Sequence, residues 1–439
     1  MKRFLIIAAC LCAGAAARAQ QAPWSLGDCI NYALDHNLSV KQSALAVEQR
    51  EVEVSTAKGR RLPGVSASAS ESLSFGRGLT SDNTYSNTNT TATSFTLGAE
   101  LPIFSGFDIT NEIKLSKLNL AAATADLEKA RDDIRVAVAQ AYVQILYNQE
   151  LLRVAHEQAT HDAALLEQVR ERRQAGMVSD AEVSAQQATL AQSRQSEIQA
   201  EGNLRIALLD LTQLLELASP EGFSIVVPEV GDPSRILLMR PEAIYDEAVA
   251  VKPAVEAAKL NVDYAELNIA RAKGAYLPRL SLRGGIGTDY YTSAKLAAPS
   301  FGDQIKNNFS QSLGVSLSIP IFQRFSVRNS VRSAQINFKG QQIQLENVKK
   351  ALYKEIQQAY YNAVTAQARY EGSQEAAASA RQHYELTEEK YKVGKAGVTD
   401  YNDARNNWLR AESEHIQARY QCLYQTKLLD FYRGQKLDF

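Results

Sequence analysis

Two proline-free stretches of about 67 residues constrain the fold of this chain more than any other feature of its sequence. The first runs from Asp108 to Gln174 and the second from Ser326 to Val393, and each follows a Pro-Ile-Phe tripeptide. Read as one helix at 1.5 Å per residue, each stretch would be roughly 100 Å long. No compact domain needs a helix of that length. The sequence therefore predicts an elongated helical structure that is present twice.

Both stretches carry an apolar residue at every seventh position, with small residues such as Ala123, Ala130 and Ala137 beside it. Such a pattern is typical of helices that pack side by side over many turns, so we expect a helical tube or bundle. The heptad positions are Ile113, Leu120, Leu127, Ile134 and Ala141, and, at an offset of 218 residues (331 − 113), Val331, Phe338, Leu345, Leu352 and Ala359.

Shorter motifs recur at almost the same offset. Ala57-Lys58-Gly59-x-x-Leu62-Pro63 returns as Ala272-Lys273-Gly274-x-x-Leu277-Pro278, and Leu101-Pro102-Ile103-Phe104 returns as Ile319-Pro320-Ile321-Phe322. An offset held across several segments indicates a structural duplication. The expected organisation is a first repeat over 20–220 (β-hairpin 62–105, long helix 108–174, return helix 179–215), a connector over 221–240, and a second repeat over 241–439 (β-hairpin 277–323, long helix 326–393, return helix 398–432).

The first residues predict export from the cytoplasm. Lys2 and Arg3 precede a short apolar run that ends in Ala17-Arg18-Ala19, a pattern typical of a secretory signal cleaved after residue 19. An N-terminal membrane anchor is the alternative. After residue 19 the sequence has no run of 18 apolar residues, so no transmembrane helix is expected.

Composition argues against several functions. The formal net charge is −1, which gives no electrostatic reason to expect nucleic-acid binding. None of the five histidines has metal-ligand spacing, and we find no nucleophile with a base in register, so neither an enzyme nor a cofactor is expected. Beyond the signal the chain keeps Cys29 and Cys422, and the sequence leaves open whether they form a disulfide.

The predicted hairpins alternate apolar and hydroxyl residues with period two, as half-buried strands do. The first strand starts at Val65 and ends at Phe75, a polar loop covers 76–93, and the return strand runs from Phe95 to Leu101. Two further strands are expected around Leu280–Ile286 and Leu313–Ile319, and Phe223–Val227 is a candidate short strand in the connector. If the strands span a membrane they must close into a barrel, which four strands cannot do, so several chains would share one. A soluble sheet is the alternative.

The most specific motifs lie where each long helix turns back. They read Arg173-Gln-Ala-Gly176-Met-Val-Ser179-Asp-Ala-Glu182 and Tyr391-Lys-Val-Gly394-Lys-Ala-Gly397-Val-Thr399-Asp400-Tyr-Asn-Asp403-Ala-Arg405. These motifs, with the duplicated helix–hairpin–long helix unit, make the chain similar to the TolC-like outer membrane factor family. The resemblance covers residue 24 to about 434.

The resemblance implies an α+β membrane protein, a homotrimer whose three chains share a 12-stranded β-barrel in the Gram-negative outer membrane lipid. An α-helical barrel would continue it across the periplasm. It implies an exit duct for a tripartite efflux pump or a type I secretion system, with a periplasmic adaptor and an inner membrane RND or ABC transporter as partners. Multidrug efflux is one such role; drugs, metals, bile-type amphiphiles and secreted proteins all fit as substrates.

The resemblance also implies site residues at the periplasmic tip. The gate would consist of Asp400, Asp403, Glu182 and Tyr391, and the docking surface of Arg173, Gly176, Ser179, Gly394, Gly397 and Thr399. Two positions depart from the family pattern, because Ala185 replaces a second acid and Ala396 replaces a basic residue. The salt-bridge part of the closing network would then be missing, and the alternatives are closure by hydrogen bonds and packing or a channel that leaks more.

Other interpretations stay open, both for the two aspartates and for the whole chain. Asp400 and Asp403 share a helical face in a first turn, where the helix dipole favours acids, so capping alone would explain either one. In a trimer the same acids would form a ring that selects cations. For the whole chain, the alternatives to a channel are a soluble periplasmic coiled-coil adaptor or scaffold and, more remotely, a secreted pore-forming toxin.

Overall fold

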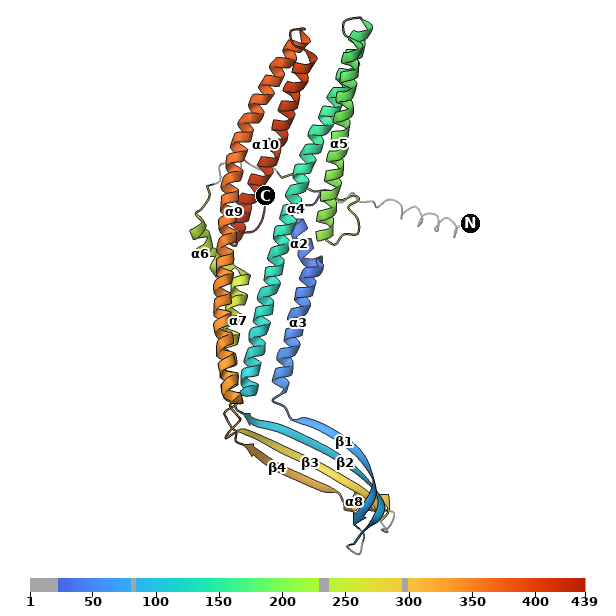
Figure 1. Ribbon diagram of the computed structural model, residues 1–439, viewed down its shortest axis with the longest axis vertical. Helices are drawn as coiled ribbons and strands as arrows, with labels where there is room; N and C mark the ends of the chain where they lie inside the picture. Colours follow the sequence, from blue (N-terminus) through green and yellow to red (C-terminus); the bar gives the residue numbers. More distant parts are fainter. Residues whose placement is uncertain (1–22, 80–83, 229–236, 294–298, 439) are drawn as a thin grey trace, which may run out of the picture. The chain divides into compact units, whose positions relative to one another are not determined.

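The computed structural model describes residues 23–79, 84–228, 237–293 and 299–438, and the expected signal 1–19 lies outside them. The elements, shown in Figure 1, are α2 Leu26–His36, α3 Leu38–Gly59, β1 Gly64–Leu79, β2 Tyr85–Ser105, α4 Asp108–Gln174, α5 Asp180–Leu214, α6 Pro241–Val251, α7 Pro253–Gly274, β3 Arg279–Ser293, α8 Phe301–Asn307, β4 Ser310–Ser318, α9 Ser326–Lys392 and α10 Val398–Tyr432.

The two halves of the chain match in element length. Helices α4 and α9 each contain 67 residues, and the return helices α5 and α10 each contain 35. Within the described residues, no helix is both long enough and apolar enough to cross a bilayer. The chain divides into a helical unit (Met1–Leu45, Ala125–Glu256, Asn347–Phe439) and a sheet unit (Ala46–Thr124, Ala257–Glu346).

The helical unit has its main core around the middle of α4. The largest buried side chains there come from α2, α4, α5 and α10 and include Tyr142, Ile145, Leu146 and Leu211. Burial raises the pKa of the Tyr142 hydroxyl, which donates to the carbonyl oxygens of Trp24 (3.2 Å) and Val226 (2.5 Å). This tyrosine therefore ties the connector and the N-terminal segment to the long helix.

The N-terminus of α2 is closed by a capping box. The Ser25 hydroxyl accepts from the backbone N–H of Asp28, and the Asp28 carboxylate accepts from the backbone N–H of Ser25. The prediction of a short strand over Phe223–Val227 is wrong, because the segment forms only an isolated parallel bridge between Ile225 and Trp24. A single bridge results because its one partner here is the short segment before α2.

The sheet unit contains four antiparallel strands in the order β1-β2-β3-β4, so β2 and β3 join the two hairpins (Figure 1). The prediction of a polar loop over 76–93 is wrong, because β1 extends to Leu79 and β2 begins at Tyr85. The register pairs Gly76 with Thr88 and Gly78 with Ser86 inside that segment. Polar composition did not exclude a strand, since the backbone groups pair across the hairpin and β-branched threonines favour extended conformations.

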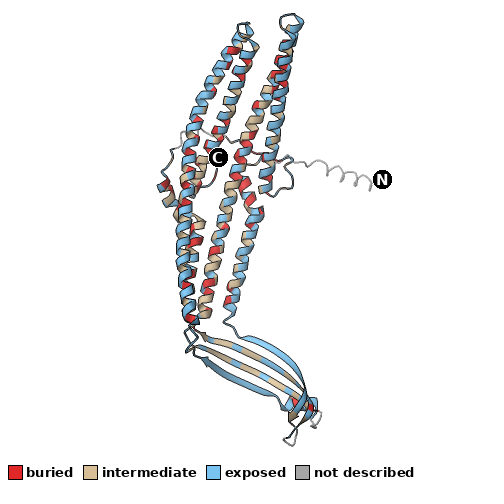
Figure 2. Cartoon of the chain, in the orientation of Figure 1, coloured by how far each residue is buried: buried red, intermediate tan, exposed pale blue. Residues whose placement is uncertain are grey.

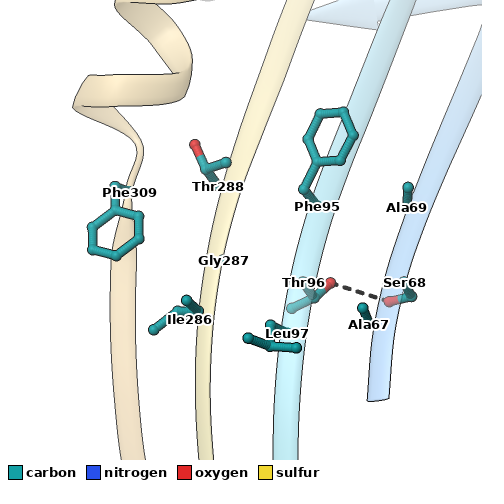
Figure 3. Close-up of a pocket in the computed structure, with 10 residues that line it drawn as sticks. All are labelled: Ala67, Ser68, Ala69, Phe95, Thr96, Leu97, Ile286, Gly287, Thr288 and Phe309. Carbon is teal, nitrogen blue, oxygen red and sulfur yellow. Dashed lines mark hydrogen bonds between the residues drawn. The ribbon is translucent and has the colours of Figure 1, made fainter. Parts of the chain in front are cut away.

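The sheet has one apolar face and one hydroxyl face. In the register, Ala67, Leu97 and Ile286 lie in one row across β1, β2 and β3, and the neighbouring row on the other face is Ser68, Thr96 and Gly287. A shallow hollow of about 570 Å³ lies on the apolar face, and Figure 3 shows the residues that line it. The strands are drawn almost entirely as exposed or intermediate in Figure 2, so the described residues leave most of both faces uncovered.

The second hairpin differs from the first at its far end. The loop after β3 contains α8, which was not predicted from the sequence. Its Gln304 side chain is buried and bonds the backbone of Tyr291 on both sides, accepting from the N–H and donating to the carbonyl, each at 2.9 Å. This amide fixes the helix against the end of the strand.

At the base of the first hairpin, α4 begins between two basic helix ends. Arg60 at the end of α3 and Arg271 at the end of α7 both form ion pairs with Asp108 and Glu112 in the first turns of α4. The preceding Gly106 has φ +63°, and a Cβ there would collide with the carbonyl of Gly274. The ends of α3 and α7, the start of α4 and the end of β2 are thus held together by charge and by a close backbone approach.

Candidate functional site at the helical turns

The two helical turns have the same backbone geometry. Gly176 and Gly394 each have φ +73°, a conformation that favours glycine. In each turn the residue after the glycine donates to a carbonyl five residues back, from Met177 to Arg172 (2.9 Å) and from Lys395 to Lys390 (2.8 Å). These bonds satisfy the last carbonyls of α4 and α9 and end both helices sharply.

The return helices start with different caps. The Ser179 hydroxyl accepts from the backbone N–H of Glu182 (3.3 Å) at the start of α5. At the start of α10 the N-cap is Gly397, whose N–H donates to the Asp400 carboxylate at 3.3 Å. The capping role that the sequence allowed for Asp400 is therefore present in the single chain.

An exposed ion pair closes the first turn. The Arg173 guanidinium forms a fork with the Asp180 carboxylate, at 2.6 Å from Nε to Oδ1 and 2.9 Å from Nη2 to Oδ2. The hydrogen bond from Arg173 holds the pKa of Asp180 below its usual value. Arg173 therefore braces the turn of its own hairpin, in addition to the docking role suggested by the resemblance.

Tyr391 lies on an aromatic cluster that the sequence analysis did not identify. Its ring stacks on that of Tyr401 with centroids 5.0 Å apart, and the Arg172 guanidinium lies 5.8 Å from its centroid. Tyr401 is 1% exposed. Its hydroxyl lies 2.6 Å from Nε2 of His161 and 3.3 Å from the hydroxyl of Tyr384, so it connects α4, α9 and α10.

Beside the aromatic cluster, a buried ion pair joins α4 to α10. Asp162 is fully buried, Arg405 is 3% exposed, and the two side chains are hydrogen-bonded. Arg405 also donates from Nη2 to the carbonyl of Gln158 at 3.1 Å. The second carboxylate oxygen of Asp162 is buried without a partner among the described residues. The two helical hairpins are thus joined by a charged contact away from solvent.

The expected gate residues do not form one cluster within the chain. Asp400 and Asp403 are exposed and Glu182 is half-buried. Among the described residues, no hydrogen bond or ion pair joins these three side chains to one another. Of the docking residues, Thr399 is exposed in the first turn of α10. The single chain brings Tyr391 to Tyr401, and any ring of acids would need further copies.

Part of the missed cluster had a signal in the sequence. Tyr384 and Tyr391, and likewise Tyr401 and Trp408, are seven residues apart and so share a helical face, and the ring of Tyr384 stacks on Trp408 at 5.1 Å. Arg405 lay inside the motif that carried the family resemblance. Asp162 had no comparable signal, because one acid in a long polar helix is indistinguishable from a solvated one.

The half-buried His161 predicts a pH dependence. Burial, reinforced by the Arg405 charge, lowers the pKa of His161, so the folded state disfavours its protonation. The contribution of neutral His161 to the stability of the folded state is therefore complete above the unfolded pKa of about 6.5. It is lost as the pH falls through that value toward the lower pKa of the folded state. We expect thermal unfolding midpoints to drop between pH 7.5 and pH 5.5, and to drop less for His161→Gln.

The exposed His383 on α9 supplies the control for this experiment. His383→Gln should keep the full pH dependence of the wild type. Burial also lowers the pKa of His415. The change of the unfolding midpoint with pH should therefore be reduced rather than abolished in His161→Gln. Equal slopes for the wild type and both variants would show that His161 is not a determinant.

Comparison with known proteins identifies relatives of this chain. The sequence matches the family model described as outer membrane efflux protein over residues 29–216 and 244–435. It is 27% identical to outer membrane protein TolC of Escherichia coli strain K12 over 360 residues, covering 79% of this chain and 71% of that protein. It is 25% identical to outer membrane protein OprJ of Pseudomonas aeruginosa over 416 residues, covering 92% and 82%.

Solved structures show the same fold. The crystal structure of CusC superposes with a TM-score of 0.77 at 17% identity and covers 95% of each chain. That of VceC from Vibrio cholerae has a TM-score of 0.75 at 18% identity and covers 94% of this chain and 96% of that one. The long helices, the duplicated hairpins and the family match together establish that the chain belongs to the TolC-like outer membrane factors, the efflux channel family of the Gram-negative outer membrane.

Proposed function

We propose that the chain forms a homotrimeric exit duct, in which three four-stranded sheets close a 12-stranded barrel and the helices continue it as a periplasmic tunnel. The observation that supports this proposal most directly is the sheet itself. It has an apolar face, a hydroxyl face and two edge strands, β1 and β4, that have no further partner within the described residues. In a bilayer such edges must be paired, and closure with other copies pairs them.

The polarity of the two faces fits this arrangement. With the apolar rows toward lipid, the hydroxyl rows that include Ser68 and Thr96 would line the lumen. All nine residues of β4 are exposed in the single chain, including Leu313 at 80% and Val315 at 66%. Exposed apolar rows of this size mark a membrane or protein contact in a stable protein. Membership in the efflux family makes this channel a better account than a soluble adaptor or a toxin.

The helical turns are the proposed gate and docking surface of this duct. Asp400 and Asp403 are exposed and three residues apart on α10, so three chains meeting on an axis would bring six carboxylates together. Such a ring selects cations and binds divalent ions. Tyr391 packed on Tyr401 would hold the closed arrangement, and Glu182 would face the same constriction.

Periplasmic adaptor proteins and an inner membrane RND or ABC transporter are the proposed partners. They would dock at Arg173, Gly176, Ser179, Gly394, Gly397 and Thr399. We further propose that the duct serves a tripartite efflux pump or a type I secretion system, with the two chain halves, 20–220 and 241–439, as its structural repeats. The energy for transport would come from the partner transporter, and the duct would conduct passively.

Single-channel conductance in a planar bilayer tests the duct and its gate together. We expect the wild type to form a cation-selective pore of low conductance that divalent cations block. In Asp400→Ala/Asp403→Ala the conductance should rise, and the divalent block should weaken about tenfold or more, because the carboxylate ring would be gone.

The control variant is Glu48→Ala/Glu51→Ala, which removes two exposed acids with the same spacing from α3. It should behave as the wild type does. A pore that is indifferent to the aspartate substitutions would keep the channel and reject the gate, leaving Asp400 as a helix cap. Absence of any pore from detergent-extracted trimer would reject the channel itself.

A further inference from the structure

The two strand-to-helix junctions share a pair of left-handed residues but differ in the charges around them. The first, Pro102-Ile-Phe-Ser-Gly-Phe107, has φ +63° at Gly106 and +64° at Phe107. The second, Pro320-Ile-Phe-Gln-Arg-Phe325, has φ +50° at Arg324 and +61° at Phe325. In each, the two phenylalanine rings meet edge to face at 87°, with centroids 5.2 Å apart in the first and 5.6 Å apart in the second.

An arginine therefore stands in a left-handed conformation where the first repeat has glycine. At Gly106 only glycine fits, because a Cβ would collide with the Gly274 carbonyl. At Arg324 a side chain is accommodated and is exposed, although L residues rarely adopt this φ. The local backbone energy would favour glycine here too, so the arginine side chain itself requires an explanation.

The charges around the two junctions also differ. In the first, Asp108 and Glu112 neutralise Arg60 and Arg271. At the corresponding positions of the second, 218 residues later, stand Ser326 and Ser330, and α9 has no acid in its first turn. Three exposed arginines lie at intervals of four residues: Arg324, Arg328 and Arg332. None of the three has an ion-pair partner among the described residues.

An apolar groove lies against this basic cluster. Its volume is about 210 Å³, and its lining includes Tyr276, Phe322, Phe325 and Arg328. The Arg328 guanidinium lies 5.9 Å from the centroid of the Phe325 ring. The groove continues the apolar row of β4, since Ile319 and Ile321 extend the alternation and are 59% and 96% exposed. The site therefore combines a surface for hydrocarbon with three unneutralised cations.

We propose that the arginine collar, defined as Arg324, Arg328 and Arg332 with the adjoining groove, binds an anionic phospholipid of the periplasmic leaflet. The phosphate would take the place that Asp108 and Glu112 fill at the first junction, and an acyl chain would lie in the groove beneath it. Arginine pairs with phosphate through paired N–H donors, and aromatic residues are enriched at the membrane–water interface. This inference rests on the proposed function in one respect, namely that the apolar face of the sheet meets the bilayer.

Native mass spectrometry of the full-length protein tests the collar. Delipidated protein in detergent is titrated with dioleoyl phosphatidylglycerol and, separately, with dioleoyl phosphatidylcholine. We expect the wild type to retain phosphatidylglycerol in preference, and Arg324→Gly/Arg328→Gln/Arg332→Gln to lose at least about tenfold in affinity for it, since each arginine near an anionic surface contributes measurably. A control that removes the same charge elsewhere, Arg194→Gln/Arg205→Gln/Arg381→Gln, should bind as the wild type does.

Arg324→Gly keeps the test decisive if the triple variant misfolds. Glycine adopts the observed φ freely, so this single variant should unfold at the same temperature as the wild type or higher while binding less phosphatidylglycerol. Unchanged preference for phosphatidylglycerol in both variants overturns the proposal. So does loss of the trimer in the variants with no change in lipid retention, because a second copy of the chain would then be what covers the groove. The measured mass of the wild-type complex shows whether the chain is a trimer, and so tests the proposed duct separately from lipid binding.

Discussion

Asp162→Ala will destabilise the helical unit by about 3–5 kcal/mol, because it leaves the Arg405 guanidinium buried without its carboxylate. Asp162 is 0% exposed, and its ion pair with Arg405 links α4 to α10. The pair lies beside the aromatic cluster around Tyr401. The loss should appear as a lower midpoint of guanidinium unfolding followed by helical circular dichroism.

Two variants make this result interpretable. Asp162→Leu/Arg405→Met removes both charges and should recover most of the stability, since apolar residues of similar volume often replace a buried ion pair at little cost. Glu167→Ala removes the acid of the largely exposed pair with Arg170 on the same helix and should cost at most about 1 kcal/mol. If Asp162→Ala costs no more than Glu167→Ala, the buried pair does not hold the hairpins together.

Gly106→Ala will destabilise the sheet unit by roughly 2–5 kcal/mol. A left-handed alanine costs about 1–2 kcal/mol by itself, and overpacking adds about 1–3 kcal/mol. The overpacking arises because the new Cβ meets the backbone carbonyl of Gly274, which cannot rotate away as a side chain would. Thermal unfolding of purified protein, together with the yield of folded protein, measures the effect.

Gly176→Ala is the matched comparison. Gly176 has nearly the same φ, +73°, but an added Cβ meets nothing within 4 Å among the described residues. Only the conformational cost of about 1–2 kcal/mol should remain. Equal effects at the two positions would mean that the approach of Gly106 to Gly274 contributes nothing to stability.

The helical part of the fold was predictable because its signals are local. Proline-free heptads set the extent of α4, which runs from Asp108 to Gln174 as expected, and glycine turns end α4 and α9. Helix α9 ends at Lys392, one residue before the expected Val393. The ends of β1 and β2 were missed because their pairing is decided by the partner strand, and polar residues such as Thr88 and Thr90 carry no apolar alternation. Helix α8 depends on Gln304 reaching the β3 backbone, a contact invisible in the sequence.

The candidate site was predictable only at its turns. The motifs around Gly176 and Gly394 located the turns and placed Tyr391 near them. They did not indicate that Tyr391 packs on Tyr401, because that contact requires α9 and α10 to be side by side. The Asp162–Arg405 pair joins residues 243 positions apart, so neither charge could be recognised as buried from its neighbours.

The two buried cysteines have a practical consequence for chemical labelling. Cys29 is 0% exposed, and burial raises the pKa of its thiol to about 12, while Cys422 is also 0% exposed. Maleimides react with exposed thiolates, and buried thiols of this kind are inert. A new cysteine at exposed Thr399 could therefore carry a fluorophore or spin label, or be crosslinked between copies, without first replacing Cys29 or Cys422. Movements of the tip could thus be followed in an otherwise unaltered chain.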